Sequence, residues 1–177
     1  MLTAAERATV VPREPPSVPR LLLAPVRSAS AVLDGGWWPR SWDPTAELPG
    51  LVLTLSGRYG RIRNLVLNSG AWSSRFRRLV VGTGVVRVGW FHSIDIALLV
   101  ATTERGDQID LLVVPPTTAA TTAENAMRAA ADPADKHHAS HVLAAAIAAT
   151  EGGEDPAAPG TGTVPTGAAR RPSDAGR

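Results

Sequence analysis

Hydrophobic and polar residues alternate through the middle of the chain, in short runs separated by Gly, Pro and polar residues. Alternation with a period of two is typical of strands that bury one face. Gly82-Thr83-Gly84 and residues 104–107 each separate two such runs and predict hairpins. The strands predicted in this way are residues 20–26, 31–38, 62–68, 79–81, 85–91, 96–102 and 108–114.

Other segments have the period of a helix. Asp43-Pro44 is a helix-start signal, with Asp as the cap and Pro at the first helical position. Pro49 is expected to kink or restart this helix, and Gly57 and Gly60 to end it. Its apolar face consists of Leu48, Leu51, Val52, Leu55 and Tyr59.

Two more helices are predicted near the C-terminus. Residues 121–124 read as a capping box that opens the first, which extends to residue 131. Asp132-Pro133 separates it from a second helix that ends at Thr150. The predicted fold is therefore α+β: a mainly antiparallel sheet of about six or seven strands, one helix after the second strand, and two C-terminal helices.

The order of these elements predicts one domain over residues 20–150. Residues 1–19 contain four prolines and no periodicity, so we expect a disordered lead-in. Residues 151–177 are rich in Gly, Pro, Ala and Thr and predict a low-complexity, disordered tail.

Composition narrows the class of protein. The chain has no cysteine, which excludes disulfides, thiolate metal ligands and a cysteine nucleophile. Charged residues and prolines interrupt the N-terminal segment, and no apolar run reaches the roughly 18 residues of a membrane helix. We therefore expect a soluble, cytoplasmic protein without a membrane partner.

Charge is unevenly distributed. Residues 20–117 contain 11 Arg and 7 acidic residues, whereas residues 118–155 contain 2 basic and 6 acidic residues. A net charge of +4 in a region of this size is ordinary, so a nucleic-acid partner is an alternative that the charge does not favour.

Trp37, Trp38 and Trp42 form an unusual cluster in a chain that is only 5% aromatic. In an extended segment Trp38, Arg40 and Trp42 would share one face, with Trp37 opposite; a twist or a bulge at Gly35-Gly36 decides which of the two faces is the inner one. Core packing is the favoured role, because Trp is usually mostly buried. The alternative is a ligand surface, with Arg40 between exposed indoles. The candidate ligand-binding residues are Asp34, Trp37, Trp38, Arg40, Trp42 and Trp72.

The other acidic residues and histidines that could belong to a catalytic or metal site have structural explanations. Asp43 is assigned as a helix cap, Glu47 as a favourable charge in the first helical turn, and Asp34 as a turn residue. His137 and His141 are one helical turn apart but lack a third ligand, so no metal is expected. His92-Ser93-Ile94-Asp95 reads as a polar loop, and phosphate-loop and dinucleotide motifs are absent. No catalytic residue and no cofactor is predicted.

Six arginines form two runs with aromatic residues between them. This pattern weakly indicates a single-strand nucleic-acid surface, which would require four of them, Arg61, Arg63, Arg77 and Arg78, to share one face. A solvated sheet face is the favoured interpretation. The two runs comprise Arg58, Arg61, Arg63, Arg75, Arg77 and Arg78.

Several motifs occur together in a fixed order over residues 20–131. The specific one is Asp34-Gly35-x-Trp37-Trp38-Pro39-Arg40-Ser41; the others are Arg20-Leu21-Leu22-Leu23-x-Pro25, Glu47-Leu48-Pro49, the Trp72 loop and Leu111-Leu112-Val113-Val114-Pro115-Pro116. Through these motifs and their order, the chain resembles a bacterial domain-of-unknown-function family, number 5994. The resemblance implies a small soluble bacterial protein and brings no activity, cofactor or catalytic residue with it.

The sequence therefore favours a non-enzymatic binding or regulatory module whose partner is unknown. One alternative is a small-molecule enzyme or ligand pocket around residues 37–43. The other is a weak single-strand nucleic-acid binder that uses the arginine-rich strands.

Overall fold

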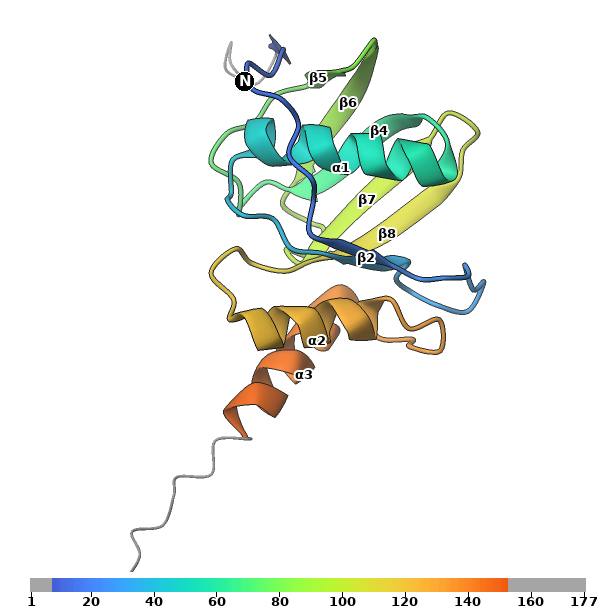
Figure 1. Cartoon of the computed structure of the whole chain (residues 1–177), viewed down its shortest axis with the longest axis vertical. Coiled ribbons are helices and arrows are strands. Elements are labelled where there is room, and N and C mark those ends of the chain that lie inside the picture. Colours follow the sequence, from blue (N-terminus) through green and yellow to red (C-terminus); the bar gives the residue numbers. More distant parts are fainter. Residues whose placement is uncertain (1–7, 153–177) are drawn as a thin grey trace, which may run out of the picture.

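The computed structural model describes residues 8–152. An eight-stranded sheet runs through the molecule in the order β1-β5-β6-β4-β7-β8-β3-β2 (Figure 1). The strands are β1 (Thr9–Val10), β2 (Leu21–Leu23), β3 (Gly35–Trp37), β4 (Ile62–Asn68), β5 (Arg78–Val81), β6 (Gly84–Phe91), β7 (Leu98–Thr103) and β8 (Gln108–Val113).

The prediction of an α+β fold with a mostly antiparallel sheet is confirmed. Antiparallel pairing joins β2 to β3, β4 to β7, β5 to β6 and β7 to β8. Parallel pairing joins β1 to β5, β3 to β8 and β4 to β6. The strand count is one higher than expected, and the first helix follows the third strand, because β1 was not predicted.

Helix α1 (Pro44–Tyr59) covers one face of the sheet. Asp43 caps it by accepting a hydrogen bond from the Thr45 amide at 2.9 Å, and the chain leaves the helix at Gly60, where φ is 92°. The expected restart at Pro49 and end at Gly57 are wrong, because the helix is continuous through both. Pro49 lacks the N–H that would bond to the Thr45 carbonyl, and the helix continues without this one hydrogen bond.

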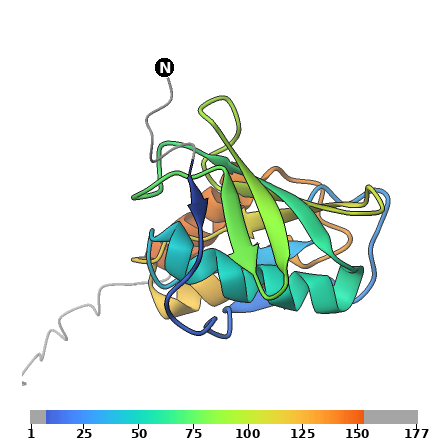
Figure 2. The same ribbon diagram turned by 90° about the horizontal axis from the view of Figure 1, so that it is seen from above.

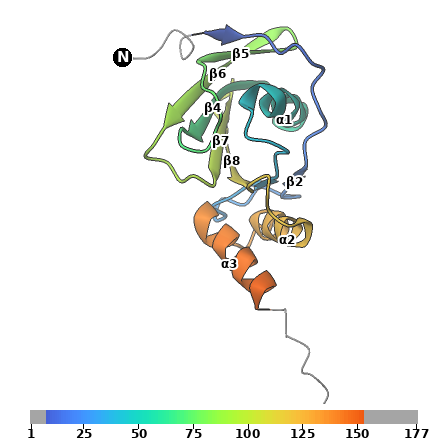
Figure 3. The same ribbon diagram turned by 90° about the vertical axis from the view of Figure 1, so that its left-hand side faces the viewer.

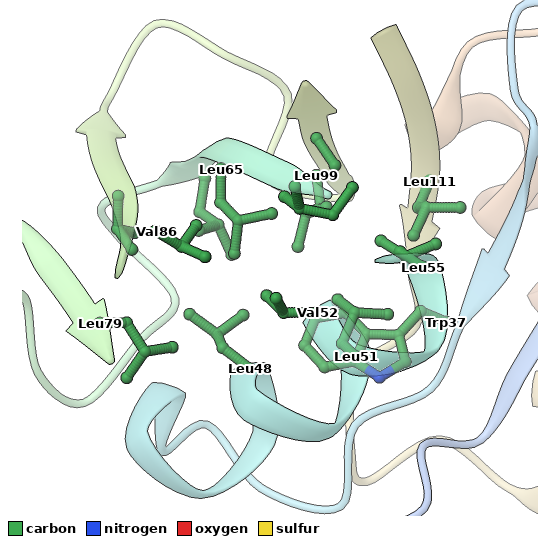
Figure 4. Packing of buried hydrophobic residues seen from close by; sticks show 14 of the residues in the cluster. Trp37, Leu48, Leu51, Val52, Leu55, Leu65, Leu79, Val86, Leu99 and Leu111 are labelled. Atoms are coloured by element: carbon green, nitrogen blue, oxygen red, sulfur yellow. The ribbon is translucent and has the colours of Figure 1, made fainter. Parts of the chain in front are cut away.

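The larger core lies between α1 and the sheet (Figure 4). Leu48, Leu51 and Leu55 are fully buried on the inner side of α1. They meet the inward side chains of the strands, which include Leu65, Leu79, Val86, Leu99 and Leu111. This apolar contact fixes α1 against the sheet, because burial of large aliphatic side chains is the main favourable contribution to folding.

Helices α2 (Ala120–Ala130) and α3 (Ala139–Glu151) cover the other face of the sheet at its β8–β3–β2 end (Figure 3). The predicted capping box is wrong: α2 begins at Ala120, and its N-cap Ala119 provides no side-chain hydrogen bond. The Thr122 hydroxyl instead donates to the Thr150 hydroxyl at 2.9 Å, which joins the two helices. Within residues 8–152, no helix covers the outer face of β5, β6 and β4 (Figure 3).

The lead-in contains structure that the sequence did not predict. Thr9 and Val10 pair in parallel with Arg78 and Leu79 of β5. The following residues cross α1 (Figure 2), where the Ser17 carbonyl packs directly on Gly50. Residues 1–7, and all but the first two residues of the expected tail, lie outside the described residues. No helix within residues 8–152 is long and apolar enough to span a membrane.

Candidate functional site

Three of the predicted tryptophans lie together on the α1 side of the sheet. Trp37 is fully buried and stacks on Trp72, with ring centroids 5.7 Å apart and an interplanar angle of 15°. Trp42 meets Trp72 edge-on, at 5.2 Å and 88°. Both Trp37 and Trp72 are buried, so these rings serve the core rather than an open surface.

Trp38 faces away from this cluster, toward α2. Its indole N–H donates to the Pro115 carbonyl at 3.2 Å, and the Arg20 guanidinium lies 3.5 Å from the ring centroid. Burial and the positive charge of Arg40 lower the pKa of Arg20. The expectation that Trp38 and Trp42 share one face is wrong, because β3 ends at Trp37 and the chain then turns into α1; Trp42 packs on the core beneath α1 and Trp38 on the core beneath α2.

Asp34 and Arg40 have separate structural partners. The Asp34 carboxylate accepts hydrogen bonds from Arg27 Nε at 3.0 Å and from the Asp110 amide at 2.9 Å. Arg40 donates to the Val18 carbonyl at 2.9 Å. The six predicted ligand-binding residues therefore do not converge on one opening.

Arg40 and Asp43 do line a hollow of about 550 Å³ between residues 10–17 and the start of α1. Glu47 lies in the same wall and accepts a hydrogen bond from the Ser41 hydroxyl at 3.0 Å. None of the tryptophans borders this hollow.

The histidine pair is arranged differently from expectation. His137 precedes α3 and His141 lies within it, so the two histidines do not occupy successive turns of one helix. Their rings stack with centroids 4.4 Å apart. His137 Nδ1 lies 2.7 Å from an Asp135 carboxylate oxygen. Within residues 8–152 no three His, Cys, Asp or Glu side chains are grouped as metal ligands.

Asp95, from the polar loop, holds α3 in place. It accepts hydrogen bonds from the amides of Ala97 and Ser140, both at 2.9 Å. Burial opposes ionisation of Asp95, but these hydrogen bonds outweigh it and lower the pKa. The carboxylate thereby substitutes for a cap that α3 lacks, since His138 at its N-cap makes no side-chain hydrogen bond.

A different cluster occupies the uncovered face of the sheet. Arg78 of β5 is directly opposite Arg87 of β6, and Asn64 of β4 pairs with Arg87 on the other side. The residues Asn64, Arg77, Arg78 and Arg87 all line one hollow of about 490 Å³. We call Asn64, Arg77, Arg78, Arg87, Gly89 and Phe91 the arginine face.

A second hollow of about 390 Å³ adjoins the first and shares Arg77, Gly89 and Phe91 with it. Ser69 and His92 are among its other lining residues. Ser69 is buried, and its hydroxyl has no hydrogen-bond partner among the described residues.

The arginine face is unbalanced in charge. Residues 61–94 contain six arginines and no acidic residue. Among the described residues, no carboxylate forms an ion pair with Arg77, Arg78 or Arg87. The run without acidic residues is the sequence signal that would have pointed to this surface.

The structure brings together only part of the arginine set that the nucleic-acid alternative required. Arg77 and Arg78 share a hollow with Arg87, which the sequence analysis had not included. Arg61 instead pairs with Glu104 at 3.3 Å. Arg63 lies at a register shift between Ile62 and Asn64 and is exposed.

Comparison with known proteins gives a family but no activity. No curated protein matches the chain, and no solved structure matches it. A family model described as a family of unknown function, DUF5994, matches residues 20–130, which is more than half of the chain. The match begins just before β2, ends with α2, and so excludes both β1 and α3. The protein therefore belongs to the DUF5994 family.

Proposed function

We propose that this protein is a non-enzymatic binding module that takes a phosphate-bearing ligand on the arginine face. The observation that carries the proposal is the direct opposition of Arg78 and Arg87, neither of which has an acidic partner within residues 8–152. Like charges opposite one another destabilise an antiparallel pair. An anion between the two guanidinium groups would remove that repulsion and accept charge-assisted hydrogen bonds.

Three carboxylates that could serve as catalytic groups have structural roles instead. Asp34, Asp43 and Asp95 each accept a backbone amide hydrogen bond that organises a strand or a helix end. An enzyme site instead requires acidic, basic or nucleophilic groups that converge on one reacting atom.

The test is thermal unfolding with and without tripolyphosphate. A ligand that binds only the folded state must raise the midpoint. We expect this rise in the wild type and its loss in Arg78→Gln and Arg87→Gln. Each variant without ligand should unfold at the same temperature as the wild type or a higher one, because the repulsion is gone.

Arg105→Gln is the matched control, because Arg105 is an exposed arginine in the turn between β7 and β8. Its response to tripolyphosphate should equal that of the wild type. An equal loss of response in all three variants would mean that net charge alone binds the anion, and the proposed site would be wrong.

A small-molecule pocket near residues 37–43 is the second candidate. The hollow lined by Arg40 and Asp43 favours it. The arginine face is the better site for an anion, because Arg40 already donates to a backbone carbonyl. The guanidinium groups of Arg78 and Arg87 have no such partner among the described residues.

A further inference from the structure

The geometry points to single-stranded nucleic acid as the ligand of the arginine face. We infer that Arg77, Arg78 and Arg87 contact its phosphates and that one base stacks on Phe91. The inference rests on the proposed function, since it names the ligand class of the same site.

Phe91 is the first observation. Its side chain is 51% exposed on the uncovered sheet face, although an aromatic ring is normally buried. The ring lies against Gly89, where an added Cβ would be only 2.9 Å from Phe91 Cε2. Glycine at this position therefore lets the ring lie close to the strand, in a hollow that Arg77, Arg78 and Arg87 also line. Aromatic rings next to basic side chains are the common platform for unpaired bases.

The continuity of the two hollows is the second observation. They share Arg77, Val88, Gly89 and Phe91, so one extended ligand can occupy both. Arg78 and Arg87 line the first hollow, and Ser69 and His92 line the second. Phe91 thus borders both a hollow lined by arginines and a hollow lined by other polar groups, which suits a chain with alternating phosphates and bases.

The Ser69 hydroxyl is the third observation. Ser69 is 5% exposed and borders the second hollow, yet its Oγ has no hydrogen-bond partner among the described residues. A buried hydroxyl without a partner is unfavourable. If the side chain rotates toward the hollow, a phosphate or base edge there provides the missing hydrogen bond.

A single strand fits this surface better than a duplex. Bases in a duplex are stacked on one another and cannot stack on Phe91. Reading of the major groove commonly uses a helix or a two-stranded ribbon that enters the groove. The arginine face instead consists of residues on three neighbouring strands, β5, β6 and β4, and of Arg77 just before β5.

The experiment measures the affinity of the full-length protein for fluorescently labelled oligonucleotides, about 12 nucleotides long and of mixed sequence, by fluorescence anisotropy. The probes are single-stranded DNA, single-stranded RNA and the duplex of the same DNA sequence. Phosphatidylserine vesicles in a flotation assay and tripolyphosphate in thermal unfolding test the other anions. We expect a single strand, of DNA or RNA, to bind at least tenfold more tightly than the duplex.

The variants separate stacking from charge. Phe91→Ala and Phe91→Leu should each weaken single-strand binding by about tenfold, because stacking on one base is lost in both. Arg78→Gln and Arg87→Gln should each weaken binding and reduce the slope of log affinity against log salt by about one. Leu53→Ala and Arg105→Gln are matched controls: both residues are exposed and neither lines the arginine face.

Each outcome decides between the two proposals. Equal affinity for duplex and single strand, unchanged affinity in both Phe91 variants, or capture by the vesicles with no oligonucleotide binding would overturn the inference. If tripolyphosphate stabilises the protein through Arg78 and Arg87 while no oligonucleotide binds, the proposed function stands and the inference fails. If neither binds, both fail.

Discussion

Trp37 and Trp38 are neighbours in sequence with opposite surroundings. Trp37 is fully buried beneath α1 and stacked on Trp72, whereas Trp38 is half-buried under Arg20 near α2. Truncation of a fully buried aromatic residue loses its burial and leaves a cavity. We expect Trp37→Ala to lower the free energy of unfolding by about 3–5 kcal/mol. Trp38→Ala should lower it by less than half as much. Urea unfolding of both variants measures the difference.

Trp42→Ala is a useful third variant, because Trp42 contacts the same ring, Trp72, from a partly exposed position. Its effect should lie between the other two. If Trp38→Ala proves the most destabilising of the three, the inward assignment of Trp37 is wrong.

The sequence predicted these residues only in part. A period of two places Trp37 and Trp38 on opposite faces, and that is what the structure shows. Which face is inward depends on where β3 lies in the sheet, and local sequence carries no information on that. The same limit applies to Arg87: its exposed position was predictable, but its pairing with Arg78 and Asn64 depends on strand register.

At the level of elements, α1 contains two glycines with different surroundings. A Cβ on Gly50 would overlap the carbonyl oxygen of Ser17 in the lead-in, whereas a Cβ on Gly57 would meet nothing within 4 Å. Alanine favours a helix over glycine by up to about 1 kcal/mol. We therefore expect Gly57→Ala to stabilise the protein by up to that amount. Gly50→Ala should destabilise it, since residues near Ser17 must move away. Midpoints of chemical unfolding compare the two variants.

The contrast between the glycines tests the position of the lead-in. A chain without residues 1–19 has no Ser17 carbonyl, so Gly50→Ala should become stabilising in that background. If Gly50→Ala is stabilising in the full chain as well, the lead-in does not pack on α1 as described.

Strands and helices with a strong local pattern were predictable, and those that depend on distant partners were not. Ile62–Asn68 matches its predicted strand at both ends, and α1 begins at the predicted Asp43 cap. β1 has only two residues and follows no pattern, because it forms by pairing with the open edge of β5. The start of α3 depends on Asp95, which is 45 residues away along the chain.

In the whole molecule, β1 is the edge strand beside β5, and α3 lies away from it, next to α2 (Figure 1); strands β2 to β8 all lie inside the family match. The family match covers residues 20–130, with neither of these flanking elements. β1 contacts β5, while α3 packs on α2 and β8. Among the described residues, the two flanks therefore differ in the strands and helices on which they mainly pack. The opposition of Arg78 and Arg87 is set by the pairing of β5 with β6, and both strands lie inside the matched region; Arg78 also pairs with Thr9 of β1.

This arrangement predicts the stability of four chains, with residues 8–152, 20–152, 8–131 and 20–131. Effects of changes at sites without shared partners usually add to within about 0.5 kcal/mol. The loss of stability in the chain of residues 20–131 should therefore equal the sum of the two single losses. Removal of residues 132–152 should cost more, because Ala139, Val142 and Ala146 are buried against α2 and β8, whereas β1 contributes only the partly buried Val10. Urea unfolding of all four chains measures these differences. A double deletion that fails to fold while both single deletions fold would show that the two flanks are coupled through the sheet.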